Sequence, residues 1–160
     1  MTIEPKEHAV DTATYPADKD SKWEKIPLDN DQWILSHNAL RCEINSMIQA
    51  LKSFMGRIDD DDGCVPDWAI NTIQEWWKAH VAHITDHCNS EEMIYKPMFT
   101  ERFHWPVEIG ELHDKLDSLK DKVQSAIDRL NSERNSLAEV HNALSMYEEN
   151  MLKHFQVEET

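Results

Sequence analysis

The sequence is poor in the two residues that most often interrupt helices. It has three glycines and six prolines among 160 residues. The prolines are Pro5, Pro16, Pro27, Pro66, Pro97 and Pro106. Since both residue types destabilise helix interiors, the three long stretches without proline permit long helices. A chain of this length can bury a core of its own without disulfides, so we expect one folded domain.

Positive charge is also scarce. Lysine and arginine total 16 against 31 aspartates and glutamates, which gives a formal net charge of −15, and the basic residues form no cluster. Binding a phosphate backbone requires clustered basic side chains, so nucleic acid and anionic membranes are excluded as partners. The sequence has no apolar run long enough to cross a bilayer and no secretory signal pattern in its first thirty residues. We therefore expect a cytoplasmic protein.

Cysteine is the third scarce residue. Cys42, Cys64 and Cys88 are odd in number and lack the close spacing of zinc motifs. This pattern suits reduced thiols in a cytosol better than a disulfide framework. We expect all three cysteines to be structural or incidental.

The distribution of apolar residues divides the chain in two. Residues 1–28 are polar and hold three of the six prolines, which predicts an irregular N-terminal arm without chemistry. Residues 29–160 form the predicted domain, because from Asp31 apolar residues recur at three- and four-residue steps.

Four helices are predicted in that domain. Their expected bounds are Asp31 to about Gly56, Pro66 to about Pro97, Pro106 to about Asn131, and Ser136 to Glu158, with a loop over 58–63. Pro66 and Pro106 suit the first turn of a helix, and Ser136 with Glu139 matches a capping box. Four amphipathic helices with short connections predict an all-α, antiparallel up-down-up-down four-helix bundle.

Several polar residues stand where these helices should face the core. The inward stripe of the second helix is predicted to be Ile70, Ile73, Trp77, His80, Ile84, His87, Glu91 and Ile94. The stripe of the fourth is Leu137, Val140, Leu144, Tyr147, Met151, His154 and Glu158, and His37 lies on that of the first. Because a buried carboxylate without a partner costs several kcal/mol, these groups need compensation.

The topology predicts that the polar residues meet. In an up-down-up-down bundle, the starts of the first and third helices lie beside the ends of the second and fourth. His37 and His113 are near helix starts, whereas the other candidates are near helix ends. Six groups can therefore converge on one layer; they are His37, His87, Glu91, His113, His154 and Glu158.

An internal repeat supports a shared site. A helix with a lone histidine is twice followed by a helix bearing His-x-x-x-Glu-Glu: His37 precedes His87 to Glu92, and His113 precedes His154 to Glu159. Residues four apart share a helix face, so each His and the first Glu can reach the same place. Two halves, each giving two imidazoles and one carboxylate, predict a two-metal site with pseudo-twofold symmetry.

The donor set favours iron. Four imidazoles and two carboxylates without a thiolate argue against a closed structural zinc site. Two iron ions, oxo-bridged, accept the five or six ligands that such a set supports, and manganese is the second choice. Ferritin-like bundles instead use Glu-x-x-His twice, and in this chain that pattern occurs only from Glu101 to His104, in a predicted loop.

The chain resembles the hemerythrin-like (HHE cation-binding) family over about residues 31–160. The resemblance rests on His-Asn-Ala-Leu-Arg at 37–41, His87-x-x-x-Glu91-Glu92 followed by Pro97, His113, and His154-Phe-x-x-Glu158-Glu159. It implies a non-heme di-iron centre that binds dioxygen, nitric oxide or peroxide. Oxygen carriers of the family have a fifth histidine one turn from the position of His113, where this chain has Ile109 and Asp117. The pattern is similar to the four-His, two-Glu subgroup, which includes proteins that repair iron-sulfur centres and iron-sensing domains of ubiquitin-ligase adaptors.

Three functions remain open. The first is a binding module for sensing, storage or carriage, and the second is a di-iron oxidoreductase that activates oxygen or reduces nitric oxide or peroxide at the same site. The third is a metal-free helical interaction module. No pattern identifies a redox partner.

Several other residues have two possible roles. His80 and His83 are either structural or additional partners of the site, and Tyr95 and Tyr147 either pack in the core or donate to bound oxygen. Glu92 and Glu159 are expected to be solvated.

Overall fold

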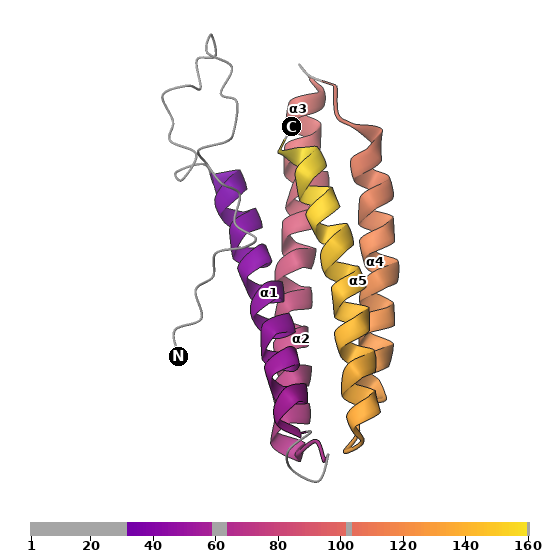
Figure 1. Ribbon diagram of the computed structural model, residues 1–160. Helices are drawn as coiled ribbons and strands as arrows, with labels where there is room; N and C mark the ends of the chain where they lie inside the picture. The colour runs from indigo at the N-terminus through magenta and orange to yellow at the C-terminus, as the bar shows by residue number, and fades with distance from the viewer. Residues whose placement is uncertain (1–31, 59–63, 102–103, 160) are drawn as a thin grey trace.

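The computed structural model describes residues 32–58, 64–101 and 104–159. The predicted arm over 1–28, and all but the first residue of the predicted loop over 58–63, lie outside these residues. The helices are α1 (Gln32–Ile58), α2 (Asp67–Ser90), η2 (Glu91–Tyr95), α3 (Lys96–Thr100), α4 (Val107–Asp128) and α5 (Arg134–Glu158). Figure 1 shows them as four antiparallel columns, because η2 and α3 extend α2. The predicted all-α four-helix bundle is confirmed.

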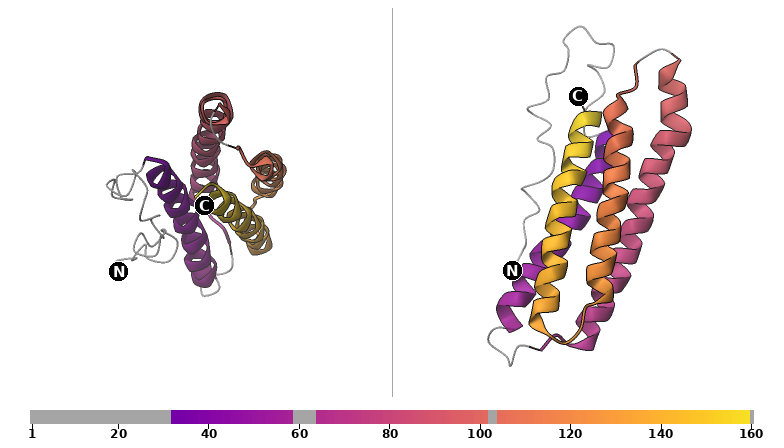
Figure 2. Two further views of the ribbon diagram at one scale, coloured as in Figure 1. Left: turned by 90° about the horizontal axis from the view of Figure 1, so that it is seen from above. Right: turned by 90° about the vertical axis from the view of Figure 1, so that its right-hand side faces the viewer.

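The columns form a closed ring. α1 packs against α2 and α5, and α4 packs against the same two helices; Figure 2 shows this arrangement end-on. The packing is uneven, because α5 packs more closely against α4 and α1 than α2 packs against either of its neighbours. Among the described helices, none is both long and apolar enough to span a bilayer.

The predicted stripes build the core. Leu40, Ile44, Ile84, Val140 and Leu144 are fully buried, and the largest buried side chains are those of Trp77, Tyr147 and Phe155. Burial of such side chains contributes about 1.5–3 kcal/mol each. Ile94 is an error in the predicted stripe, because it is 54% exposed.

A π-helical turn explains that error. Across η2, the backbone N–H of Lys96 donates to the carbonyl of Glu91, five residues earlier rather than four. The extra residue rotates everything beyond it by about 100° relative to the preceding stripe. The helix also does not end at about Pro97 as predicted, because this proline stands in the first turn of α3, which continues to Thr100.

Three helix starts also differ from the prediction. Pro66 and Pro106 are the N-cap residues of α2 and α4, one position before the first turn, with extended backbones. The predicted capping box at Ser136 is wrong, because α5 begins at Arg134. The Ser136 hydroxyl instead donates to the carbonyls of Asn131 and Glu133, at 3.1 and 2.7 Å, and accepts the N–H of Asn131 at 3.2 Å.

Candidate metal centre

The structure brings the six predicted residues together at one end of the bundle. His37 lies in the second turn of α1 and His113 in the second turn of α4, while His87, Glu91, His154 and Glu158 lie in the last turns of α2 with η2 and of α5. This is the end where α3 and the label C appear in Figure 1. The side chains of His37, Glu91, His154 and Glu158 are fully buried, and those of His87 and His113 are 9% and 12% exposed.

Glu91 stands between two pairs of imidazoles. Its Oε1 lies 2.8 Å from Nε2 of His87 and 3.9 Å from Nε2 of His37. Its Oε2 lies 3.1 Å from Nε2 of His113 and 3.7 Å from Nε2 of His154. Each carboxylate oxygen therefore faces a different pair.

Glu158 spans the same two groups from the opposite helix. Its Oε2 lies 3.2 Å from Nε2 of His37, and its Oε1 lies 3.4 Å from Nε2 of His154. The two glutamates thus lie across a layer that has His37 and His87 on one side and His113 and His154 on the other.

Several atoms in this layer are buried without a hydrogen bond. Within the described residues, Nε2 of His87 and His154, Oε1 of Glu91 and both carboxylate oxygens of Glu158 have no hydrogen-bond partner. Nε2 of His87 and Oε1 of Glu91 nevertheless approach to 2.8 Å. Since an unsatisfied buried polar group costs about 1–3 kcal/mol, the arrangement favours a ligand between these atoms. Their nitrogen and oxygen donors suit a pair of metal ions.

The donors form two groups of four that share Glu91. One group is His37, His87, Glu91 and Glu158, and the other is Cys88, Glu91, His113 and His154; in each, the donor atoms lie within 4.8 Å of one another. Cys88 was expected to be structural or incidental, because no cysteine pattern marks it. The available signal was its place directly after His87, one turn before Glu91 and Glu92.

Two outer carboxylates orient the lone histidines. Glu159 Oε1 lies 2.8 Å from Nδ1 of His37, and its Oε2 accepts from Arg41 at 2.8 Å. Glu92 Oε1 lies 3.3 Å from Nδ1 of His113. A carboxylate at Nδ1 holds the proton there and leaves Nε2 facing the site. The expectation that Glu159 is solvated is therefore wrong, since its side chain is 6% exposed, whereas Glu92 is 34% exposed.

When no metal is bound, protons on His37 and His113 offset the negative charge of the nearby carboxylates. Burial lowers the pKa of His37, but Glu158, Glu159 and Glu91 outweigh this effect and raise the pKa to about 10. Burial likewise lowers the pKa of His113, while contacts with Cys88 and Glu91 raise it to about 10.

The carboxylates respond in opposite ways. Burial raises the pKa of Glu91, but His113, His37 and His87 hold it well below its usual range. Burial raises the pKa of Glu158 to about 7. Metal ions must displace the histidine protons, so binding releases protons and strengthens with pH.

His80 and His83 lie outside this layer. Nδ1 of His80 is 2.9 Å and Nδ1 of His83 is 2.8 Å from opposite oxygens of Glu43. Nε2 of the buried His80 lies 3.2 Å from the Tyr147 hydroxyl. These contacts favour the structural role for both histidines and for Tyr147. Tyr95 is 37% exposed.

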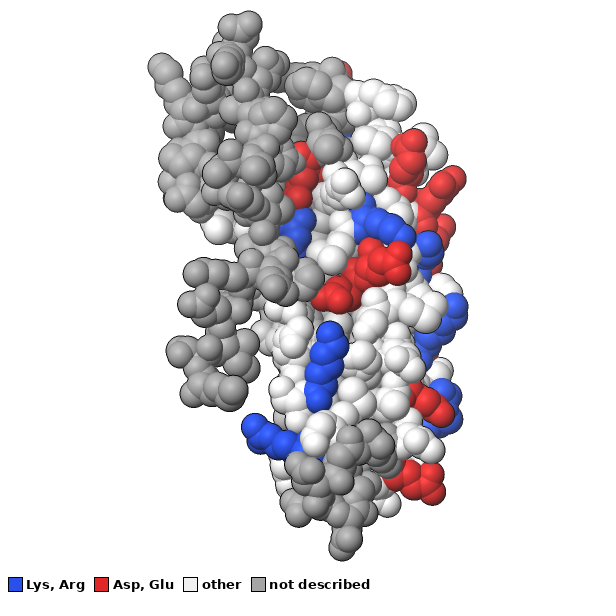
Figure 3. Space-filling view, viewed as in Figure 1, with Lys and Arg blue, Asp and Glu red and all other residues white. Residues whose placement is uncertain are grey.

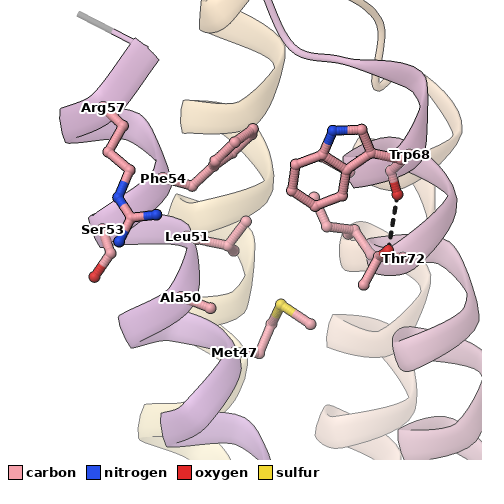
Figure 4. A pocket seen from close by; sticks show the side chains of 10 residues that line it. Met47, Ala50, Leu51, Ser53, Phe54, Arg57, Trp68 and Thr72 are labelled. Carbon is pink, nitrogen blue, oxygen red and sulfur yellow. Dashed lines mark hydrogen bonds between the residues drawn. The ribbon is translucent and has the colours of Figure 1, made fainter. Parts of the chain in front are cut away.

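An apolar pocket lies far from the polar layer, between α1 and α2 (Figure 4). It has a volume of about 340 Å³ and is flanked by Phe54 and Trp68, whose ring centroids are 5.7 Å apart. Leu51, in its wall, is 14 residues from His37 on the same helix, which is about 20 Å. The pocket is therefore not part of the polar layer.

Comparison with protein-family models, with characterised proteins and with solved structures found no match to this chain. The functional assignment consequently depends on the site itself. The chain is a four-helix bundle with a buried His/Glu cluster able to hold metal, which is consistent with the hemerythrin-like resemblance of its sequence.

Proposed function

We propose that this chain is a non-heme di-iron protein that binds dioxygen, nitric oxide or peroxide, for sensing, storage or carriage. The observation that carries the proposal is the placement of Glu91 and Glu158. Each carboxylate presents one oxygen to each of two imidazole groups, as bridging ligands of an ion pair would.

The residues divide into two half-sites. His37 and His87 would hold one ion, His113 and His154 the other, and Glu91 and Glu158 would bridge them. Such an iron pair supplies open coordination positions for a small ligand and the ability to change oxidation state. Iron fits better than a structural zinc ion. With two imidazoles and two bridging carboxylates, each ion has four protein ligands and can take further ligands, whereas a structural zinc site is closed at four.

Phe155 and an ion pair cover the side of the polar layer that holds His37 and His87. The Phe155 ring stacks on His37 with centroids 4.2 Å apart and lies 5.7 Å from the His87 ring. The Arg41 guanidinium lies 5.1 Å from the Phe155 centroid while it pairs with Glu159. The buried phenyl ring of Phe155 gives the half-site of His37 and His87 an apolar wall, which suits a small uncharged ligand such as dioxygen or nitric oxide.

The oxidoreductase alternative requires the same ligands and stays a prediction. A cytoplasmic location agrees with the three free thiols of Cys42, Cys64 and Cys88. The resemblance to the four-His, two-Glu subgroup supports sensing more than reversible oxygen carriage.

The test is to load the purified chain anaerobically with ferrous iron, measure metal per chain, and record optical spectra after adding air, nitric oxide or peroxide. We expect two irons per chain and a charge-transfer band in the near ultraviolet after oxidation. His83→Ala serves as the control variant, because His83 lies outside the layer. A colourless protein that retains a single zinc ion would refute the proposal.

A further inference from the structure

The two halves of the site are related by a pseudo-twofold repeat that extends beyond the predicted ligands. In one half, Glu159 contacts Nδ1 of His37; in the other, Glu92 contacts Nδ1 of His113. The residue that directly follows the histidine of each His-x-x-x-Glu motif also lies beside a lone histidine. Phe155 stacks on His37, and the sulfur of Cys88 lies within 4.8 Å of a ring nitrogen of His113.

This repeat places different chemistry at equivalent positions. A phenyl ring has no lone pair for a metal ion, whereas a thiol that loses its proton is a strong ligand for iron, zinc and cobalt. The halves are therefore symmetric in their histidines and glutamates but differ at Phe155 and Cys88.

The geometry around Cys88 is that of a ligand set. Its sulfur lies within 4.8 Å of donor atoms of Glu91, His113 and His154. Donor atoms about 2.0–2.3 Å from one ion are separated by roughly 3 to 4.6 Å, so this spacing is close to what a single ion requires. A second observation is His154, which is fully buried and has neither ring nitrogen hydrogen-bonded within the described residues.

We propose that Cys88 binds, as a thiolate, the metal ion held by His113 and His154, so that the two ions of the pair have different ligands. The inference rests on the proposed function. When the ion binds, the S–H bond of Cys88 breaks, its proton leaves to solvent, and the sulfur forms a bond to the metal. The half-site of His37 and His87 keeps only nitrogen and oxygen donors.

Cobalt(II) is a suitable probe, because cobalt–thiolate bonds give a charge-transfer band that nitrogen and oxygen ligands do not. The full chain is titrated with cobalt(II), with the metal content and absorption spectrum measured in the same samples. Cys42→Ser/Cys64→Ser is the matched control, since both residues are exposed and the double variant leaves Cys88 as the sole cysteine. We expect the thiolate band in the wild type and in this double variant.

Cys88→Ser should lose the band while still binding cobalt through its histidines and carboxylates. Two bound cobalt ions without a thiolate band in the double variant would overturn the role of Cys88 and leave the di-metal site intact. A band that persists in Cys88→Ser would overturn the role as well. A chain that binds neither cobalt nor iron would overturn both proposals, so the metal content separates the two failures.

Discussion

Glu91 is the residue on which the polar layer depends most, because its two oxygens face different imidazole pairs. Glu91→Gln removes one negative charge and turns an oxygen into an amide group that cannot bind a cation. We expect this variant to hold at most one iron, and that weakly. The measurement is iron per chain after loading and desalting.

Glu92→Gln is the matched control for Glu91→Gln. Glu92 is 34% exposed, and among the described residues it pairs with Nδ1 of His113 and with Lys96. Loss of an outer carboxylate of this kind lowers metal affinity on the order of tenfold to a hundredfold. Equal metal loss in the two variants would contradict a bridging role for Glu91.

His37→Ala and His113→Ala should each empty or weaken one half-site, since the two imidazoles face different oxygens of Glu91. Competition with a chelator measures the affinity of each ion. His83→Ala should leave both affinities within about tenfold of the wild type. If it removed metal as completely as His113→Ala, His83 would belong to the site.

His80 makes a contribution to stability that depends on pH. Burial lowers its pKa in the folded chain from 6.5, against the opposing effect of Glu43, while His83 and Lys120 add to the lowering. The unfolded chain therefore binds more protons below pH 6.5, and stability falls as pH falls through that value.

The test uses metal-free protein, because metal binding at the six-residue layer also depends on pH and would change the measured stability. Urea unfolding is measured near neutral pH and at about pH 5.5 for the wild type, His80→Gln and His83→Gln. We expect a smaller loss of stability on acidification in His80→Gln than in the wild type. An unchanged loss in His80→Gln would show that His80 does not titrate in this range.

The sequence predicted the contacts of the six polar residues because they depend only on helix periodicity and bundle topology. It did not predict the roles of Cys88 and Glu159. They depend on which side chain of a neighbouring helix lies opposite each residue: His113 for Cys88, and His37 with Arg41 for Glu159. Periodicity within one helix carries no information about that pairing.

At the scale of elements, η2 is the main departure from the predicted pattern. The apolar spacing predicts a regular helix that keeps Ile94 on the inward face and ends at about Pro97. The π-helical turn shifts the hydrogen-bond register by one residue, which carries the helix past Pro97 and turns Ile94 outward. A one-residue change of register leaves no mark in composition, so it could not be predicted.

Glu158 is the last residue of α5 and Glu159 is its C-cap, whereas the buried apolar stripe of that helix ends earlier, at Phe155. Removing residues 157–160 should therefore leave the bundle helical by circular dichroism. The remaining site lacks a bridging carboxylate and the partner of His37, so we expect at most one loosely held iron.

On adding iron, the melting temperature of the truncated chain should rise much less than that of the full chain, because a loosely held ion stabilises the fold less by mass action. The single substitution Glu158→Gln is the control that separates the carboxylate from the missing backbone. Two tightly held irons in the truncated chain would exclude Glu158 as a ligand.

At the scale of the whole molecule, charge of one sign dominates. The net charge is −15, and Figure 3 shows the basic side chains scattered among acidic ones on the visible face. Mutual repulsion among acidic groups destabilises the compact state, and salt screens it. We expect sodium chloride to raise the melting temperature of the metal-free chain.

Melting curves at low and at physiological ionic strength test this expectation, with a neutral osmolyte as the control for effects unrelated to charge. A melting temperature that does not change with salt would indicate that repulsion is already balanced by pairs such as Lys153 with Glu149 and Lys120 with Asp117.

The uneven packing of the ring determines which helix depends most on metal. α2 has the smallest packed contact with its neighbours, yet with η2 it carries His87, Cys88 and Glu91. Segments with few tertiary contacts open locally at lower free energy than the rest of a fold. In metal-free protein, amide hydrogens of α2 should exchange with solvent deuterium sooner than those of α5, and metal should slow α2 most. Bound iron would then link α2, through its ligands, to the three helices that pack more closely with one another. Loss of the metal would let α2 separate from the bundle before the other helices unfold.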